Sequence, residues 1–521
     1  MIDRKNRRRH SGANQASTLR GALVVLAILA PIQAQAQDIR FHGVETGDLL
    51  REETLELRFG WHQSNSETTG GTGQQVYESG IAYRGTGEWQ LGARVSVYDD
   101  PPPAAIGGSL ANLSILSIGV EAKRSFIETE RLSGAVTASF EGFRYASGLS
   151  KSDIEIDTVV GSLHAPVSLS LTPKLRAHID PAVAFLPDRM NGGDGFGTTA
   201  FLGTALSWEA TDRVTAYAEA TYQVAGRGNT FDASGAIVRD LAWSAGARIQ
   251  VAPAADLDLY VTNRAGGTMA TSGLTLPPNG DQTLFGAQLV YRPGQDREPR
   301  PETDQNAVRP PDGLMLRSGA ILPLETRRLI ASAGTGGAAT LGISTSPDTG
   351  LQFDVFLERH AEASADQVSV APGPNRYMLG GRLQLHEPTA ALPVWIAAGV
   401  FAGRETEPPG AGAFYGELTA SKTLRSGYSV RVQPHIAAWG DQRRVGLGLG
   451  ISRPVSDTLE LIGEFSLNGS REDTWATGIR WNRQNALSFT AFATNSIGLQ
   501  GHGTMIAAKE PRLQVSLERS F

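Results

Sequence analysis

The sequence predicts an all-β fold of the transmembrane antiparallel β-barrel type, and three observations carry this prediction. Segments of about ten to fourteen residues alternate apolar and polar side chains, and a tilted strand needs about this length to cross a bilayer. In the first half of the chain, long connections between these segments alternate with short ones, as in outer-membrane barrels. No run of eighteen or more apolar residues occurs, which excludes a transmembrane helix.

The first 36 residues have the pattern of a secretory signal peptide. Basic residues come first, at Arg4, Lys5, Arg7, Arg8, Arg9 and Arg20. The apolar stretch 22–32 follows, and then the small-x-small triplet Ala34-Gln35-Ala36. We therefore expect residues 1–36 to be removed by cleavage after Ala36.

Charge and composition narrow the function classes. The chain carries 47 Lys+Arg and 53 Asp+Glu, a net charge of −6, and loss of the basic leader makes the remainder more acidic. This balance argues against a nucleic-acid partner. The chain has no cysteine, so its stability must come from a large hydrogen-bonded core, which a closed barrel provides. Nine histidines show no ligand spacing, so neither a metal site nor a cofactor is expected.

The segment 88–98 illustrates the alternation within one strand. One face carries Trp89, Leu91, Ala93, Val95 and Val97, and the other carries Glu88, Gln90, Gly92, Arg94 and Ser96. Such a strand fits a soluble sandwich as well as a barrel, but the sorted loop lengths favour a barrel with lipid outside and a polar lumen inside.

The segment Val445–Ile451 alternates glycine with aliphatic residues. We predict that Leu447 and Leu449 face lipid. On the opposite face, Gly446 and Gly448 are expected to tolerate a small polar side chain at lower cost than an arginine at either leucine.

A charged, proline-rich stretch at 294–312 divides the chain into two similar halves. The predicted organisation is a signal peptide (1–36), a first barrel (37–293), a periplasmic linker (294–312) and a second barrel (313–521). Each half contains about twelve strand-like segments, which favours two tandem barrels of about twelve strands each. One barrel of about 24 strands is the alternative, because both arrangements close every strand edge.

Sequence matches between the halves indicate an internal duplication. The first is the opening G-x-x-L-x-x-E-T, which begins at Gly47 and again at Gly319. Later pairs are Thr211-Asp212 with Ser456-Asp457, Glu219 with Glu464, Trp243-x-x-Gly246-x-Arg248 with Trp475-x-x-Gly478-x-Arg480, and Thr262-Asn263 with Thr494-Asn495. The spacing predicts that each repeated Trp and Arg lie on opposite faces of one strand.

Two barrel units in one secreted chain, with duplicated openings, resemble the exopolysaccharide-associated outer-membrane proteins of the YjbH type. The resemblance implies a role in the export or secretion of a surface polysaccharide. It concerns the architecture of residues 44–521 and carries over no functional residue.

Charged residues on the polar faces are the candidate functional groups. These predicted lumen-lining residues are Arg94, Arg176, Glu219, Arg248, Glu417, Arg431, Glu464 and Arg480. They either select solutes in an open channel or fill a closed barrel with ion pairs, since twelve strands lie between the filled and the open barrel sizes. His178 and Asp180 share a face and raise the separate hypothesis of an acid–base pair.

Three function classes remain open. The favoured one is an outer-membrane channel or export-linked, porin-like protein that is not an enzyme, with surface polysaccharide as the suggested cargo. The alternatives are a structural or surface-display barrel without an open pore, and a barrel hydrolase. The predicted partners are outer-membrane lipid, the barrel-assembly machinery and polysaccharide-export components. The amphipathic segment 511–520 followed by Phe521 is the predicted assembly signal.

Overall fold

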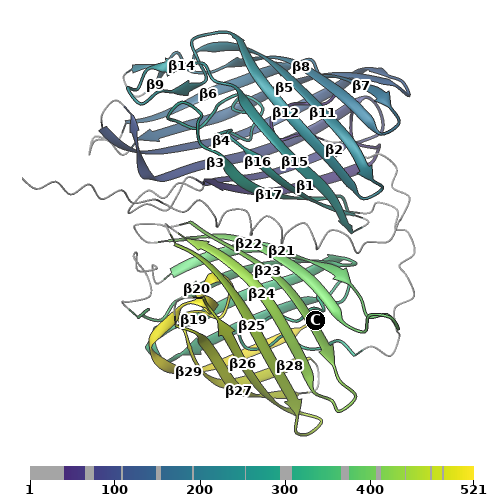
Figure 1. Ribbon diagram of the computed structural model, residues 1–521, viewed down its shortest axis with the longest axis vertical. Helices are drawn as coiled ribbons and strands as arrows, with labels where there is room; N and C mark the ends of the chain where they lie inside the picture. The colour runs from purple at the N-terminus through teal and green to yellow at the C-terminus, as the bar shows by residue number, and fades with distance from the viewer. Residues whose placement is uncertain are drawn as a thin grey trace, which may run out of the picture.

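The chain folds into two closed antiparallel β-barrels that lie side by side (Figure 1). The computed structural model describes residues 40–64, 75–106, 109–147, 154–190, 193–252, 254–293, 308–364, 375–406, 412–439, 442–469, 472–483 and 486–521. Ala36 and the predicted signal peptide lie outside the described residues. The prediction of two barrels is confirmed, and the alternative of one large ring is wrong, because each barrel closes on its own first strand.

The first barrel has twelve strand positions within the described residues. Its wall is formed by β1 (Thr54–Ser64), β2 (Gln75–Arg84), β3 (Trp89–Ile106), β4 (Ser109–Glu128), β5 (Leu132–Ser147), β6 (Ile154–His164), β7 (Val167–Thr172), β8 (Leu175–Phe185), β11 (Thr198–Thr211), β12 (Val214–Ala225), β15 (Ala242–Ala252), β16 (Ala255–Thr262) and β17 (Leu284–Tyr291). β17 pairs with β1 and closes the ring. Two short hairpins, β9 (Arg189–Met190) with β10 (Gly193–Asp194) and β13 (Thr230–Phe231) with β14 (Ile237–Val238), lie in the loops.

β6 and β7 share one position in this ring, since both pair with β5 on one side and β8 on the other. The sequence pattern predicts a single strand over 156–170. Pro166 interrupts it, because proline has no N–H to donate to the ladder, while its carbonyl still accepts from the Ala135 N–H at 3.0 Å.

The second barrel is a ring of twelve strands in sequence order. They are β18 (Arg327–Gly334), β19 (Ala339–Asp348), β20 (Leu351–Arg359), β21 (Asn375–His386), β22 (Trp395–Glu405), β23 (Gly412–Thr423), β24 (Ser429–Trp439), β25 (Gln442–Pro454), β26 (Leu459–Leu467), β27 (Thr474–Arg483), β28 (Leu487–Ser496) and β29 (Ala507–Ser520). The short 3₁₀ helices η2 (Thr335–Gly337) and η3 (Gly501–Met505) lie in connections. Phe521 follows β29, and its N–H donates to the Arg327 carbonyl at 2.9 Å.

Strand alternation sorts apolar side chains outward and polar ones inward. In β3, Trp89 and Leu91 are 54% and 60% exposed, whereas Gln90 and Ser96 are buried. Because the outer surface is apolar and the lumen is polar, the fold is that of an outer-membrane β-barrel. Among the described residues, no helix is long and apolar enough to cross a membrane.

β25 faces the directions that the sequence predicts, but its glycines are not spacious positions. Leu447 and Leu449 lie on the outer face, 37% and 42% exposed. A Cβ at Gly448 would lie 2.5 Å from a methyl carbon of Leu316, and one at Gly446 would lie 2.4 Å from Nε2 of His435. The space behind both glycines is filled, by Leu316 and by His435, so a side chain there has a cost of its own. That this cost is lower than that of an arginine at either leucine stays a prediction.

Two segments of the chain enter each lumen. One of them is a plug, the segment just before the first strand of the barrel. The first plug (residues 40–53) precedes β1, and the second plug (residues 308–325) precedes β18. In the first barrel, Phe41 and Val44 of the plug pack on Tyr217 and Tyr260 of the wall. The last long connection of each barrel, which we call the cap loop (263–283 and 497–506), adds a second buried apolar cluster in each barrel. Both lumens are therefore occupied by the protein itself.

The two barrels pack against each other through their outer faces. Trp61 of β1 stacks on Phe414 of β23, with ring centroids 3.9 Å apart and an interplanar angle of 4°. Tyr291 contacts Phe353 edge to face and donates from its hydroxyl to Asp348 Oδ2 at 3.3 Å. A buried cluster of Ala254, Ala255, Tyr291, Leu351 and Leu383 continues this contact.

Candidate functional site

The eight predicted lumen-lining charges lie on the inner faces of the two barrels, and seven of them bind the plug of their own barrel directly. The plug partners are Glu45 for Arg94, Asp48 for Arg176, Gly43 and Val44 for Glu219, Arg40 for Arg248, Pro311 for Arg431, residues 314–316 for Glu464, and Gly313 for Arg480. The eighth, Glu417, accepts from Arg382 Nε at 3.0 Å, and Arg382 in turn donates to the carbonyl of Ser318 in the second plug. The site is therefore a plug-binding lumen in each barrel.

Glu219 on β12 holds the first plug by its backbone. Its carboxylate accepts from the N–H groups of Gly43 at 3.0 Å and Val44 at 2.9 Å. The guanidinium of Arg264, from the cap loop, lies 3.3 Å from the same carboxylate, and both side chains are fully buried. Hydrogen bonds to an ionised group are stronger than those between neutral groups, so this carboxylate is a main anchor.

Glu464 on β26 does the same in the second barrel. Its carboxylate accepts from the N–H groups of Leu314, Met315 and Leu316 at 2.9, 2.6 and 3.1 Å. Its counter-ion is Arg431, at 3.0 Å. The repeated glutamates thus occupy equivalent positions and do equivalent work, although the compensating arginine comes from a strand rather than from the cap loop.

Each repeated arginine binds a backbone carbonyl in the first half of its plug. Arg248 Nη2 donates to the Arg40 carbonyl at 2.8 Å, and Arg480 Nη2 donates to the Gly313 carbonyl at 3.0 Å. Each is also paired with an acid on a neighbouring strand, Asp258 at 3.0 Å and Glu460 at 3.3 Å. In each lumen, therefore, a carboxylate accepts from N–H groups of the plug and a guanidinium donates to one of its carbonyls. We call this pair of contacts the backbone grip.

The repeated G-x-x-L-x-x-E-T opening is explained by a third set of matching contacts. The N–H of Gly47 donates to Ser168 Oγ and that of Gly319 to Ser421 Oγ, both at 2.8 Å. A Cβ at either glycine would lie 2.2 Å from a wall carbonyl oxygen, that of Ser133 or Trp395, so only glycine fits.

The same motif also sets the register at which each plug joins its barrel. The N–H groups of Leu50 and Leu322 donate to Gln90 and Gln352 on the wall, both at 2.9 Å. Glu53 and Glu325 both have positive φ, 56° and 61°, which turns the chain into the first strand. The duplicated sequence is thus a duplicated plug.

The repeated Thr-Asn pairs fix the cap loops. Asn263 Oδ1 accepts from the Trp243 N–H at 2.8 Å, and Asn495 Oδ1 accepts from the Trp475 N–H at 2.7 Å. These side chains replace the strand pairing where each cap loop leaves the wall and turns inward.

Charge is inverted between the two plugs at one equivalent position. Glu45 of the first plug lies within 3.5 Å of Arg40, Arg94 and Lys123. Arg317, at the matching position of the second plug, is 3.7 Å from Asp354 and 3.9 Å from Asp312. Each barrel thus neutralises its own plug.

Neighbouring arginines lower the pKa of one aspartate in each plug, Asp312 and Asp48. Burial by itself raises the pKa of Asp312, but the guanidinium groups of Arg328, Arg382 and Arg317 outweigh it and hold that pKa well below its usual range. In the first plug, burial likewise opposes the hydrogen bond and charge of Arg176, which lower the pKa of Asp48.

His178 and Asp180 do not pair with each other. His178 Nδ1 lies 2.7 Å from Ser168 Oγ, while Asp180 Oδ2 contacts His164 Nδ1 at 2.9 Å and accepts from the Glu45 N–H. Ser168 Oγ also accepts from Gly47, so both groups belong to the plug-binding surface.

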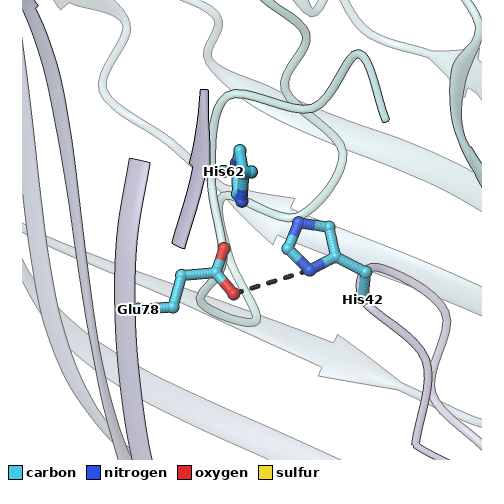
Figure 2. Close-up of side chains that lie close together, drawn as sticks. All are labelled: His42, His62 and Glu78. Carbon is cyan, nitrogen blue, oxygen red and sulfur yellow. Dashed lines mark ion pairs between the residues drawn. The ribbon is translucent and has the colours of Figure 1, made fainter. Parts of the chain in front are cut away.

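The spacing of residues in the sequence does not predict one cluster of side chains in the first barrel. His42 in the first plug, His62 on β1 and Glu78 on β2 turn their side chains toward one another (Figure 2), with one candidate ligand atom from each within 4.8 Å of the others. His42 Nδ1 is 3.5 Å from Glu78 Oε2. Only the folding of the plug into the barrel brings His42 to the two strands.

No protein-family model matches the chain, and no curated protein matches it in sequence. Among solved structures, the chain is similar to the KdgM porin at 9% identity over 45% of this chain and 98% of that one, with a TM-score of 0.29. It is similar to the NanC porin at 8% identity over 46% and 98%, with a TM-score of 0.27. It is also similar to outer membrane phospholipase A from Escherichia coli at 9% identity over 46% and 92%, with a TM-score of 0.27.

Proposed function

We propose that this protein is an outer-membrane pair of porin-like barrels, each closed at rest by its own plug, and that displacement of a plug opens a path for an exported surface polysaccharide. The observation that carries the proposal is the matched polar grip on both plugs. Duplication has kept the glutamate, the arginine and the serine that bind plug backbone in each lumen.

The chemistry of this grip favours a removable plug over a permanent core. Lumen charges such as Glu219 and Arg248 are satisfied by the plug backbone and by paired charges, and water can satisfy the same groups once the plug leaves. Between the second plug and its wall, two cavities have volumes of about 40 and 10 Å³, room for a few water molecules at most. A structural barrel without a pore is the second candidate, and this tight filling favours it.

The polysaccharide cargo rests on the resemblance to YjbH-type proteins. The two-barrel architecture in one chain agrees with that resemblance. The net negative charge of the chain is compatible with an uncharged glycan as cargo. Loss of surface polysaccharide in a strain lacking this chain, with restoration by the wild-type gene, is the expected result for an export role.

A disulfide lock tests whether the plug is a gate. The chain has no cysteine, so an engineered pair is the only one present. Val44 Cγ2 lies 3.1 Å from the position of a Cβ on Gly203, which is close to the roughly 3 Å between a Cβ and the far sulfur of a disulfide. Val44→Cys with Gly203→Cys should therefore tie the first plug to β11.

The lock is combined with Glu219→Gln, which removes the anchoring charge. In planar bilayers we expect this triple variant to conduct under reducing conditions and to close on oxidation. Glu219→Gln without the cysteines should conduct under both conditions and is the control. If none of these variants conducts more than the wild type, the gated-channel proposal is wrong and the barrel is structural.

A further inference from the structure

We propose that His42, His62 and Glu78 form a binding site for a divalent transition-metal ion of the zinc class, which ties the first plug to the wall of the first barrel. The three side chains come from the plug, from β1 and from β2, so a shared ion would cross-link three separate parts of the chain (Figure 2). This site is independent of whether the barrel conducts.

The three side chains are buried and incompletely satisfied. The side chains of His42 and Glu78 are 3% and 9% exposed, and His62 is fully buried. His42 Nε2, His62 Nε2 and Glu78 Oε1 have no hydrogen-bond partner among the described residues. Buried polar atoms are nearly always paired, because an unpaired one costs about 1–3 kcal/mol, and one bound ion would satisfy all three of these atoms at once.

The second coordination sphere is already in place. His62 Nδ1 lies 3.0 Å from the hydroxyl of Tyr260, so Nε2 of the same ring is the nitrogen that would bind the ion. Metal-binding histidines characteristically use their other ring nitrogen in this way, since the contact fixes both tautomer and ring orientation. The ring of Tyr260 also packs on His42, with centroids 4.8 Å apart.

The cap loop seals the cluster from the loop end of the barrel. A Cβ at Gly267 would lie 1.9 Å from Glu78 Oε1, so the loop backbone passes directly over this carboxylate. Arg264 of the same loop forms an ion pair with Glu219 at 3.3 Å.

The second barrel shows that these residues are not needed to hold a plug. Aligning Thr54 with Thr326 places Gly334 at the position of His62, Thr340 at that of Glu78 and Leu314 at that of His42. The second plug docks through the same backbone grip without any of the three groups. The cluster is therefore an addition to the first barrel, and a docking role alone does not explain it.

The donor set selects the class of ion. Two imidazole nitrogens and one carboxylate oxygen suit zinc and its first-row neighbours, whereas calcium requires about six to eight oxygen ligands. Metal–ligand distances of about 2.0–2.2 Å place tetrahedral donors roughly 3.5 Å apart. The candidate ligand atoms here lie within 4.8 Å of one another, so a bound ion would draw them together by about 1 Å.

The test is binding of Zn²⁺ to the purified, metal-stripped full chain, measured by calorimetry and by metal content after gel filtration. We expect one Zn²⁺ per chain for the wild type, and binding at least about 100-fold weaker for His42→Leu and for Glu78→Gln. His42→Leu installs the residue found in the second barrel, and Glu78→Gln preserves shape, so at least one of them should retain the folded, heat-modifiable form.

The matched control is His435→Gln, a buried lumen histidine of the second barrel, which should bind Zn²⁺ like the wild type. Mg²⁺ alone should not bind to any of these proteins. Absence of stoichiometric Zn²⁺ on the wild type would overturn the proposal. Unchanged binding in the folded His42→Leu or Glu78→Gln chain would do the same.

Discussion

Glu219 and Glu464 occupy the same place in two different barrels, and each carboxylate accepts consecutive backbone N–H groups from the segment that fills its lumen. A side chain that binds backbone does not depend on the sequence of the plug. The two plugs have diverged accordingly, with Glu45 and Arg317 inverted in charge, while the grip has not.

We predict that Glu219→Gln loosens the first plug without unfolding the barrel. Charge-assisted hydrogen bonds contribute about 1.5–3 kcal/mol each, so plug opening should become about tenfold more frequent or higher still. In a Val44→Cys background, the rate of maleimide labelling reports this opening directly.

The control for that experiment is Glu88→Gln, which removes one partner of the exposed ion pair with Arg124. Exposed pairs contribute about 0–1 kcal/mol, so labelling should not change. Equal labelling of the Glu219→Gln and Glu88→Gln proteins would show that the plug is not held by Glu219.

Gly448→Ala should be costly because of one plug side chain. The new methyl group would lie 2.5 Å from Leu316 Cδ2, and overpacking of this kind costs about 1–3 kcal/mol. Leu316→Ala combined with Gly448→Ala should recover much of that loss, which a double-mutant cycle of unfolding free energies would measure.

Leu449→Arg provides the lipid-facing comparison. It should cost about 2–4 kcal/mol if the residue lies near the bilayer midplane, and Leu316→Ala should not rescue it. Rescue of both substitutions, or of neither, would contradict the assignment of the two faces of β25.

The walls of both barrels follow from the sequence, because an alternation of period two specifies a strand and its faces locally. Residues such as Trp89 and Gln90 point outward and inward as their polarity predicts. The duplication is also legible, since Gly47 and Gly319 recur in matching contexts.

The plugs do not follow from the sequence. Residues 40–53 have no periodic pattern, and their partners, such as Ser168 and Glu219, are brought together only by closure of the ring. The sequence predicts which charged side chains face the lumen. It does not predict whether these side chains contact water or the plug. For the same reason, the spacing of His42, His62 and Glu78 in the sequence does not predict that their side chains lie together.

Acid should weaken the second plug. The pKa of Asp312 is depressed in the folded protein, so its ion pairs contribute stability above the ordinary aspartate pKa of about 3.9, and this contribution is lost as the pH falls below it. We expect the accessibility of a cysteine at Leu316 to be constant from neutral pH to about pH 5 and to rise below about pH 4.

Asp312→Asn should make the second plug accessible at neutral pH and flatten its acid dependence, because Arg328, Arg382 and Arg317 then lose their shared counter-ion at a cost of about 3–5 kcal/mol. Asp457→Asn, in the exposed turn between β25 and β26, is the control and should leave the profile unchanged. An acid profile that is identical in the Asp312→Asn protein would assign the transition to other groups.

Tyr260→Phe should weaken zinc binding although Tyr260 is not a proposed ligand. Its hydroxyl lies 3.0 Å from His62 Nδ1, and loss of such an orienting contact typically lowers metal affinity about 10–100-fold. Tyr217→Phe removes a hydroxyl from an equally buried tyrosine of the same barrel, one that packs on Phe41 rather than on the histidines, and is the matched control. We expect calorimetry with Zn²⁺ to separate the two proteins, with Tyr217→Phe binding like the wild type. Equal affinities for the two variants would mean that Tyr260 does not orient His62 toward an ion, and that the contact between them serves packing alone.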